Sequence, residues 1–246
     1  MELKDKVILI TGAAERVGRQ IALHMASQKG SHIAFTYYQE SEPWQVTESN
    51  LQDLGVKAKA YPLDISDPAQ IKRLVAVVLN DFGRIDALVN NAGVWLKAPF
   101  LEITERAWDI AMSVNLKGPF LLSQAVAPIM QAQPEGGVIL NITDLSAYQI
   151  WEGYTHHAVS KIGLAWMTRY MALELAPKIR VNAIAPGTVM LPENAPPEKV
   201  AWAVEKSALK RVGCADDVAC MAEFLLEHDF TTGSVYFIDG GRSLVG

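Results

Sequence analysis

The 246-residue sequence has only two cysteines, Cys214 and Cys220, and their spacing fits neither a redox pair nor half of a zinc site. It also has no excess of basic residues, because 22 lysines and arginines stand against 27 acids and give a net charge of −5. That balance disfavours non-specific nucleic-acid binding, which depends on Lys and Arg. No apolar run reaches the roughly 18 residues of a membrane-spanning helix. We therefore expect no metal, nucleic acid or membrane as a partner.

The composition does supply enough apolar material for a sizeable core. Half of the residues are hydrophobic and 20% are charged, which excludes a disordered chain. The first residues, Met1 to Lys6, are mostly charged and lead directly into an apolar run, a pattern unlike a secretory signal peptide. The sequence therefore predicts a cytoplasmic protein.

Short apolar runs alternate with longer helical patterns along the chain. Continuous Val, Ile and Leu runs predict strands buried on both faces, as in a parallel sheet. The predicted strands are residues 7–11, 32–37, 57–62, 86–90, 137–142, 178–184 and 234–238. One predicted helix ends near residue 28, and the others span 42–54, 67–80, 104–130, 154–176, 196–209 and 216–227. Asp67 and Pro68 are expected to cap and begin the helix over 67–80, and the stretch 104–130 is expected to be interrupted near Gly118-Pro119. This alternation predicts one α/β domain over residues 1–246, a Rossmann-type doubly wound sheet of about seven strands.

The first predicted strand leads into a turn of small residues, Thr11-Gly12-Ala13-Ala14-Glu15-Arg16-Val17-Gly18. Such residues let the backbone approach a pyrophosphate, and the next helix offers free N–H groups. An ordinary strand-to-helix turn could have the same composition. The position directly after the first strand favours the dinucleotide interpretation.

Other strand ends also carry residues suited to a nucleotide. Asp64 could accept a hydrogen bond from an adenine amino group. Asn90-Asn91-Ala92-Gly93 would let a ribose lie close, although Asn and Gly also simply tolerate positive φ in a turn. The proline-rich segment 186–197 follows the sixth strand, and we expect residues 186–209 to form a substrate loop with a small helix.

Taken together, these motifs resemble those of the short-chain dehydrogenase/reductase family over essentially the whole chain. Arg16 replaces the usual middle glycine of the turn, a form similar to the pteridine-reductase branch. The resemblance implies an NAD(P)-dependent oxidoreductase. It assigns dinucleotide binding to Gly12, Arg16, Val17, Gly18, Tyr37, Tyr38, Ser41, Asp64, Ile65, Asn91, Ala92, Gly93, Lys161, Pro186 and Gly187.

The choice between NADP(H) and NAD(H) depends on the end of the second strand. An NAD enzyme of this fold usually has an acidic residue there, whereas this chain has Tyr37. Arg16 could pair with an adenosine-side phosphate, and Tyr38 and Ser41 could donate hydrogen bonds to it. Glu15 and Glu40 would oppose a phosphate by like-charge repulsion. The sequence favours NADP(H), with NAD(H) as the alternative.

In the family, a tyrosine four residues before a lysine supplies the proton. Lys161 matches that lysine, but His157 stands in the tyrosine position, and Asp144 stands where most of the family has serine. Three interpretations remain open: His157 is the general acid beside Asp144, Tyr154 replaces it, or the site binds nucleotide without turnover. The resemblance also implies that Lys161 binds the nicotinamide ribose and that Asn115 keeps a helix kinked for a proton relay.

Aromatic and apolar residues predict the substrate side of the site. Trp95, Trp151, Tyr154 and Met190 suggest a flat slot suited to a ring system, although Trp151 and Met190 could instead pack the loop or a subunit contact. The first hypothesis is an NADPH-dependent reductase of a pterin or similar planar C=N or C=O compound. The second is a carbonyl reductase or alcohol dehydrogenase acting on a sugar, acyl or ketone substrate, and the third is a non-catalytic nucleotide-binding protein. The resemblance also implies a homotetramer.

Overall fold

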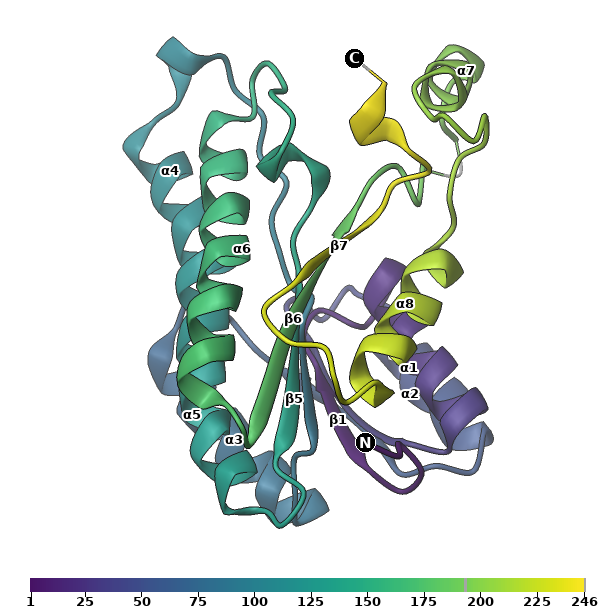
Figure 1. Cartoon of the computed structure of the whole chain (residues 1–246). Helices are drawn as coiled ribbons and strands as arrows, with labels where there is room; N and C mark the ends of the chain where they lie inside the picture. The colour runs from purple at the N-terminus through teal and green to yellow at the C-terminus, as the bar shows by residue number, and fades with distance from the viewer. Residues whose placement is uncertain (193, 246) are drawn as a thin grey trace.

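Seven parallel strands form one sheet in the order β3-β2-β1-β4-β5-β6-β7 (Figure 1). This computed structural model describes residues 1–192 and 194–245, so Glu193 in the predicted substrate loop lies outside it. The strands are β1 (Val7–Ile10), β2 (His32–Tyr37), β3 (Ala58–Pro62), β4 (Ala87–Asn90), β5 (Gly137–Ile142), β6 (Ile179–Pro186) and β7 (Val235–Ile238). Strand order changes direction between β1 and β4, the point at which doubly wound sheets bind ligands. The predicted fold class is confirmed.

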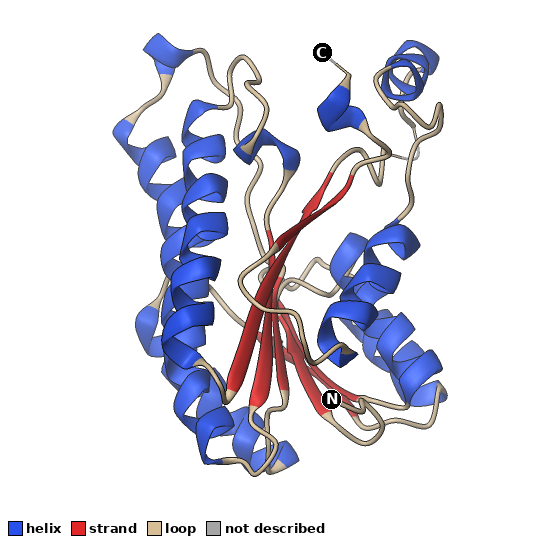
Figure 2. Ribbon diagram, viewed as in Figure 1, coloured by secondary structure: helices blue, strands red, loops and turns tan. Residues whose placement is uncertain are grey.

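Helices cover both faces of the sheet (Figure 2). One layer holds α3 (Pro68–Phe82), α4 (Glu105–Met112), α5 (Gly118–Ala132) and α6 (Thr155–Leu175), and the other holds α1 (Arg16–Lys29), α2 (Trp44–Asp53) and α8 (Ala215–Glu227). Helix α7 (Pro197–Glu205) lies beyond the carboxyl ends of the strands. Because both faces are covered, every residue of β1, β4 and β5 is buried. Among the described helices, none is both long and apolar enough to cross a bilayer.

Local sequence explains where most helices begin. Asp67 caps α3 by accepting from the backbone of Ala69 and Gln70, and Pro68 occupies the first helical position, as predicted. Helix α2 departs from the prediction, since it begins at Trp44 rather than at residue 42. Its expected first residue, Glu42, instead turns back and accepts hydrogen bonds from the preceding loop. A side chain that bonds nearby backbone competes with helix formation in this way.

The predicted long helix over 104–130 is interrupted by one π-helical turn, Ser113–Lys117, between α4 and α5. Such turns are rare and occur frequently at functional sites. Asn115 lies within it and is fully buried. At the start of α5, a Cβ on Gly118 would lie 2.7 Å from the Ile65 carbonyl oxygen, so this glycine allows the helix to approach the loop after β3. The π turn therefore places Asn115 beside the carboxyl end of β4.

Candidate active site

A cavity of about 860 Å³ opens at the carboxyl ends of the central strands. Its walls come from the turn after β1, the ends of β2, β3 and β4, and helix α4. Most of the residues assigned to dinucleotide binding line it: Gly12, Arg16, Val17, Gly18, Tyr37, Tyr38, Asp64, Ile65, Asn91, Ala92, Gly93 and Pro186. The structure therefore gathers residues from distant parts of the chain around one space of suitable size for a ligand.

Three residues of that assignment lie outside the cavity lining. Ser41 is exposed and its hydroxyl donates to Gln39 Oε1 at 3.4 Å. Gly187 extends β6, since its N–H donates to Ile238 O at 2.9 Å. A Cβ there would lie 2.8 Å from Asp239, so this glycine serves contact with the end of β7. Lys161 is buried behind the cavity wall and donates to Ile142 O at 2.9 Å.

The turn after β1 is tied to the end of β4. The Asn91 side-chain amide donates to Thr11 O at 2.9 Å and to Gly12 O at 2.8 Å. The Thr11 hydroxyl accepts from the backbone of Asn91 and Ala92, both at 3.0 Å. Gly18 packs onto this junction so closely that a Cβ would lie 2.5 Å from both Asn91 Nδ2 and Gly12 O. The shape of the turn therefore depends on glycine at position 18.

We expect Gly18→Ala to raise the Kd for NADH or NADPH at least about tenfold, because the added methyl group must push the turn and Asn91 apart. Titration of the intrinsic tryptophan fluorescence measures the change. Gly55→Ala is the control, since Gly55 has φ +81° but no atom within 4 Å of its Cβ position. It should lower stability without changing the Kd. Unaltered affinity in Gly18→Ala would contradict this role of the turn.

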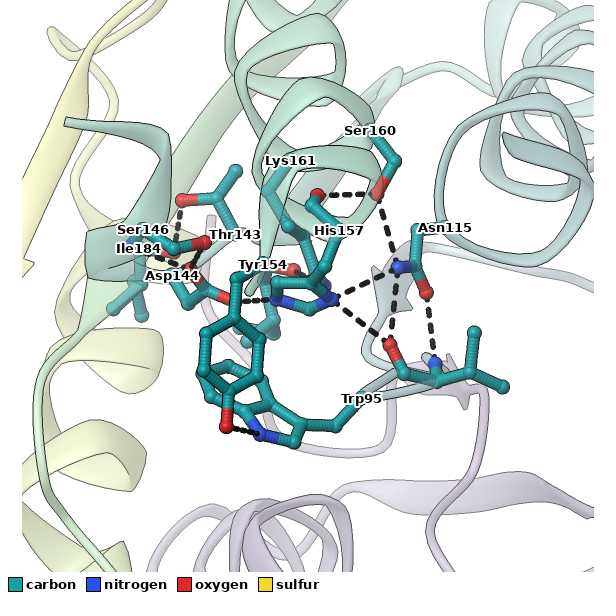
Figure 3. A network of polar contacts seen from close by, with 12 residues as sticks. Trp95, Asn115, Thr143, Asp144, Ser146, Tyr154, His157, Ser160, Lys161 and Ile184 are labelled. Carbon is teal, nitrogen blue, oxygen red and sulfur yellow. Dashed lines mark hydrogen bonds and ion pairs between the residues drawn. The ribbon is translucent and has the colours of Figure 1, made fainter. Parts of the chain in front are cut away.

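His157 and Asp144 lie at the centre of a network of polar contacts (Figure 3), which reaches the cavity at Val94. His157 Nε2 contacts Asp144 Oδ2, and His157 Nδ1 lies 3.0 Å from Val94 O. Asn115 Nδ2 also lies 3.4 Å from Nδ1, but its two hydrogens have shorter acceptors in Val94 O and Ser160 Oγ, at 3.1 and 3.0 Å. Both ring nitrogens of His157 therefore face oxygens that accept hydrogen bonds.

Asp144 is held as a carboxylate by its neighbours. Burial raises its pKa, but the hydrogen bond from His157, the charge of Lys161 and the Ser146 hydroxyl outweigh burial, and the pKa lies below its ordinary value. The Ser146 backbone N–H also donates to Asp144 Oδ1 at 2.7 Å. For Lys161, burial lowers the pKa and Asp144 opposes that shift. Asp144, His157 and Lys161 thus form one cluster of interacting polar side chains, and Lys161 connects it to Ile142, which lines the cavity.

Asn115 fixes the position of this cluster relative to β4. Its Oδ1 accepts from Val94 N–H at 2.8 Å, and its Nδ2 donates back to Val94 O. Val94 O is the same oxygen that faces His157 Nδ1. The resemblance assigned Asn115 to a proton relay through a kinked helix. The structure has a π-helical turn at this residue and a direct connection from Asn115 through Val94 to His157.

The aromatic residues predicted to flank an open slot contact one another instead. The Trp95 ring lies 4.4 Å from that of His157, 4.8 Å from that of Tyr154 and 5.8 Å from that of Trp151, between centroids. The Tyr154 hydroxyl accepts from Trp95 Nε1 at 3.2 Å and points away from His157 (Figure 3). Met190 lies on the loop after β6. The Trp95 ring therefore packs against His157, and the three aromatic side chains contact one another.

Two residues near the site, Arg242 and Glu42, were not predicted from the sequence. Arg242, in the turn after β7, lies 4.7 Å from the rings of both Trp151 and Trp202 and donates to the Thr188 hydroxyl. Glu42 lines the cavity at the end of β2. No sequence motif indicates either residue. Arg242 contacts segments that are distant in the sequence, and Glu42 reaches the cavity because the loop after β2 turns.

Comparison with known proteins agrees with this architecture. The family model described as enoyl-(acyl carrier protein) reductase matches residues 12–243. A 3-oxoacyl-[acyl-carrier-protein] reductase of Thermotoga maritima is 38% identical over 98% of this chain and 99% of its own. An L-rhamnose 1-dehydrogenase (NAD(P)(+)) of a Sphingomonas species is 31% identical over 97% and 96%. The crystal structure of a putative short-chain alcohol dehydrogenase from Sinorhizobium meliloti has a TM-score of 0.93 and 32% identity, covering 100% of this chain and 99% of that one.

A doubly wound sheet with a cavity at its switch point, matched over its whole length by oxidoreductases, defines an NAD(P)-dependent enzyme of the short-chain type. The chain belongs to the short-chain dehydrogenase/reductase family.

Proposed function

We propose that the protein reduces the carbonyl group of a small sugar, acyl or ketone compound with a reduced nicotinamide dinucleotide, and that His157 donates the proton. The observation that carries this proposal is the pairing of His157 with Asp144 beside Lys161. The resemblance places the proton-donating tyrosine of the family at position 157. A histidine with both nitrogens engaged by acceptors offers a proton from the same helix position.

The residues around the cavity fit a dinucleotide. Glu15, at the N-cap of α1, makes no side-chain hydrogen bond to the first turn, so the helix N-terminus is free to receive a phosphate. Asp64 Oδ1 is oriented by the Ser66 N–H and hydroxyl, and the carboxylate faces the cavity. Gly12 and Gly93 let the cavity wall pack closely, since a Cβ on Gly12 would lie 3.0 Å from Ala92 Cα and one on Gly93 would lie 3.3 Å from Lys161 Nζ.

When bound, the reduced nicotinamide supplies the hydride that adds to the carbonyl carbon. Negative charge then develops on the carbonyl oxygen, and the His157 Nε2 proton neutralises it. Because Nε2 faces Asp144, the substrate oxygen must take the place of the carboxylate oxygen at that proton. Asp144 remains anchored by Ser146, and Lys161 contributes a buried positive charge that favours the developing anion. After proton transfer, the Nδ1–H of His157 stays on Val94 O.

A carbonyl substrate has more support than the pterin that the sequence analysis placed first. The relatives named above include a 3-oxoacyl reductase, a sugar dehydrogenase and a putative alcohol dehydrogenase, and no pterin enzyme is among these three. We retain residues 186–209 as the proposed substrate loop and helix.

Two further expectations come from the resemblance. We propose a homotetramer, which is supported by large apolar side chains exposed on the outer helices, among them Phe120 on α5 and Trp166 and Leu173 on α6. We also propose a cytoplasmic location.

Oxidation of NADH and NADPH, followed by absorbance, tests the proposed activity. The panel contains a short 3-oxoacyl thioester, a vicinal diketone, an aldonolactone and dihydrobiopterin. We expect turnover with at least one of the three carbonyl compounds at a kcat of about 1 s⁻¹ or more, and slower turnover or none with the pterin. Turnover of dihydrobiopterin alone would contradict the proposed substrate class, and no turnover with any compound would contradict the proposed reaction.

A further inference from the structure

We infer that Glu42 makes the adenosine end of the cavity selective for NAD(H) over NADP(H). The inference rests on the proposed function, since it requires the cavity to bind a nicotinamide dinucleotide. Glu42 Oε1 accepts from the backbone N–H of Tyr38 at 2.9 Å and from that of Gln39 at 2.7 Å. All three residues line the cavity directly after β2.

Adjacent backbone N–H groups at the end of a strand could receive an anionic phosphate. Here those of Tyr38 and Gln39 are already bonded to a carboxylate of the chain itself. A 2′-phosphate at this place would be repelled by the negative charge of Glu42. The backbone N–H groups of Tyr38 and Gln39 would also not be free to donate to it. The 2′- and 3′-hydroxyls of NAD(H), in contrast, can donate to the second oxygen of Glu42, for which no partner is found among the described residues.

The loop is held in this arrangement by contacts on its other side. The Tyr37 hydroxyl donates to Glu40 Oε1 at 2.9 Å, and the Trp44 indole donates to Glu40 Oε2 at 3.3 Å. The rings of Tyr37 and Trp44 are stacked with centroids 4.8 Å apart. Because Glu40 is engaged there, it fixes the loop, and Glu42 is the acid of this loop that lines the cavity.

Arg16 is the residue that would favour NADP(H). It stands at the start of α1 with φ +56° and is exposed, and no hydrogen bond or ion pair of its guanidinium is found among the described residues. Glu15, its neighbour in the chain, also lines the cavity and opposes a second phosphate. A pyrophosphate would bind at the N-terminus of α1. Arg16 can therefore pair with the pyrophosphate, which NAD(H) and NADP(H) both contain. The charges of this end therefore favour the dinucleotide without the 2′-phosphate.

The test is a calorimetric titration of the whole protein with NADH and with NADPH, which needs no turnover. We expect NADH to bind at least about tenfold more tightly than NADPH. Glu42→Gln keeps the size and the accepting oxygen but removes the charge, and it should shift the ratio of the two Kd values toward NADPH by about tenfold. Glu40→Gln removes the same charge two residues earlier, outside the cavity lining, and should shift the ratio less than about threefold. Arg16→Ala should weaken both dinucleotides to a similar extent.

Tighter binding of NADPH by the unaltered protein would overturn the inference, as would an unchanged ratio in Glu42→Gln. If Arg16→Ala weakened the binding of NADPH but not of NADH, Arg16 would be the residue that binds the 2′-phosphate. That result would also overturn the inference. If neither dinucleotide bound, both the inference and the proposed function would fall. Selective NADH binding without carbonyl turnover would support the inference and contradict the proposed reaction alone.

Discussion

His157→Phe is expected to lower kcat for carbonyl reduction by about 10²- to 10⁴-fold, the usual contribution of a positioned acid. The phenyl ring keeps the contact with Trp95 but provides no proton and no partner for Asp144. The Kd for the dinucleotide should stay within about threefold, because His157 does not line the cavity. Steady-state kinetics together with a binding titration separate the two effects, and a thermal unfolding curve confirms that the variant is folded.

Tyr154→Phe is the matched control for that substitution. It removes a hydroxyl whose described hydrogen bond is to Trp95. We expect it to retain most of the activity, because that hydroxyl points away from Asp144 and His157. The reverse pattern, with His157→Phe active and Tyr154→Phe inactive, would transfer the acid role to Tyr154.

Asp144→Asn is expected to lower kcat by about 10²-fold or more, since an amide that donates toward His157 Nε2 disfavours the protonated nitrogen that the mechanism needs. It should also change stability with pH. Burial alone would raise the pKa of Asp144, but His157 and Lys161 hold it below the ordinary value. Its charge therefore stabilises the fold above the unfolded pKa of about 3.9, and that contribution is lost as the pH falls through the folded pKa.

Urea unfolding between neutral and acidic pH measures this contribution. The unaltered protein should be more stable than Asp144→Asn at neutral pH, and the difference should shrink as the solution is acidified. Ser146→Ala is the control, because it removes one hydroxyl donor to Asp144 and leaves the charge and the Ser146 N–H in place. A variant Asp144→Asn with unaltered kcat would remove Asp144 from the mechanism.

The strands and the turn after β1 could be predicted because their signals are local. Continuous apolar runs define strands buried on both faces, and parallel strands bring their carboxyl ends together at one edge. Gly12, Asp64 and Asn91 therefore meet at the cavity although they are far apart in the sequence. The four-residue spacing of His157 and Lys161 likewise predicted that both side chains lie on one face of a helix.

The remaining details depend on side-chain directions that spacing does not define. Tyr154 was expected to be the first residue of the helix over 154–176, but α6 begins at Thr155, and the Tyr154 ring turns toward Trp95. Glu42 was expected to begin a helix, and it turns back onto the loop instead. The aromatic residues expected to flank a substrate slot contact one another, an arrangement that their positions in the sequence do not indicate. For Tyr154 a contact with a distant segment determines where the side chain points, whereas for Glu42 a local hydrogen bond to the preceding backbone does.

The native site is proposed to be catalytic with histidine as its acid. The most direct test compares the rate of carbonyl reduction by the unaltered protein with that by His157→Tyr. Both proteins are assayed with the same dinucleotide and the same carbonyl compounds. We expect the unaltered protein to reduce at least one carbonyl compound, at a rate that depends on His157 and Asp144. Turnover only after tyrosine is introduced would contradict it, because the pocket would then bind its ligands while the native chain lacks a working proton donor.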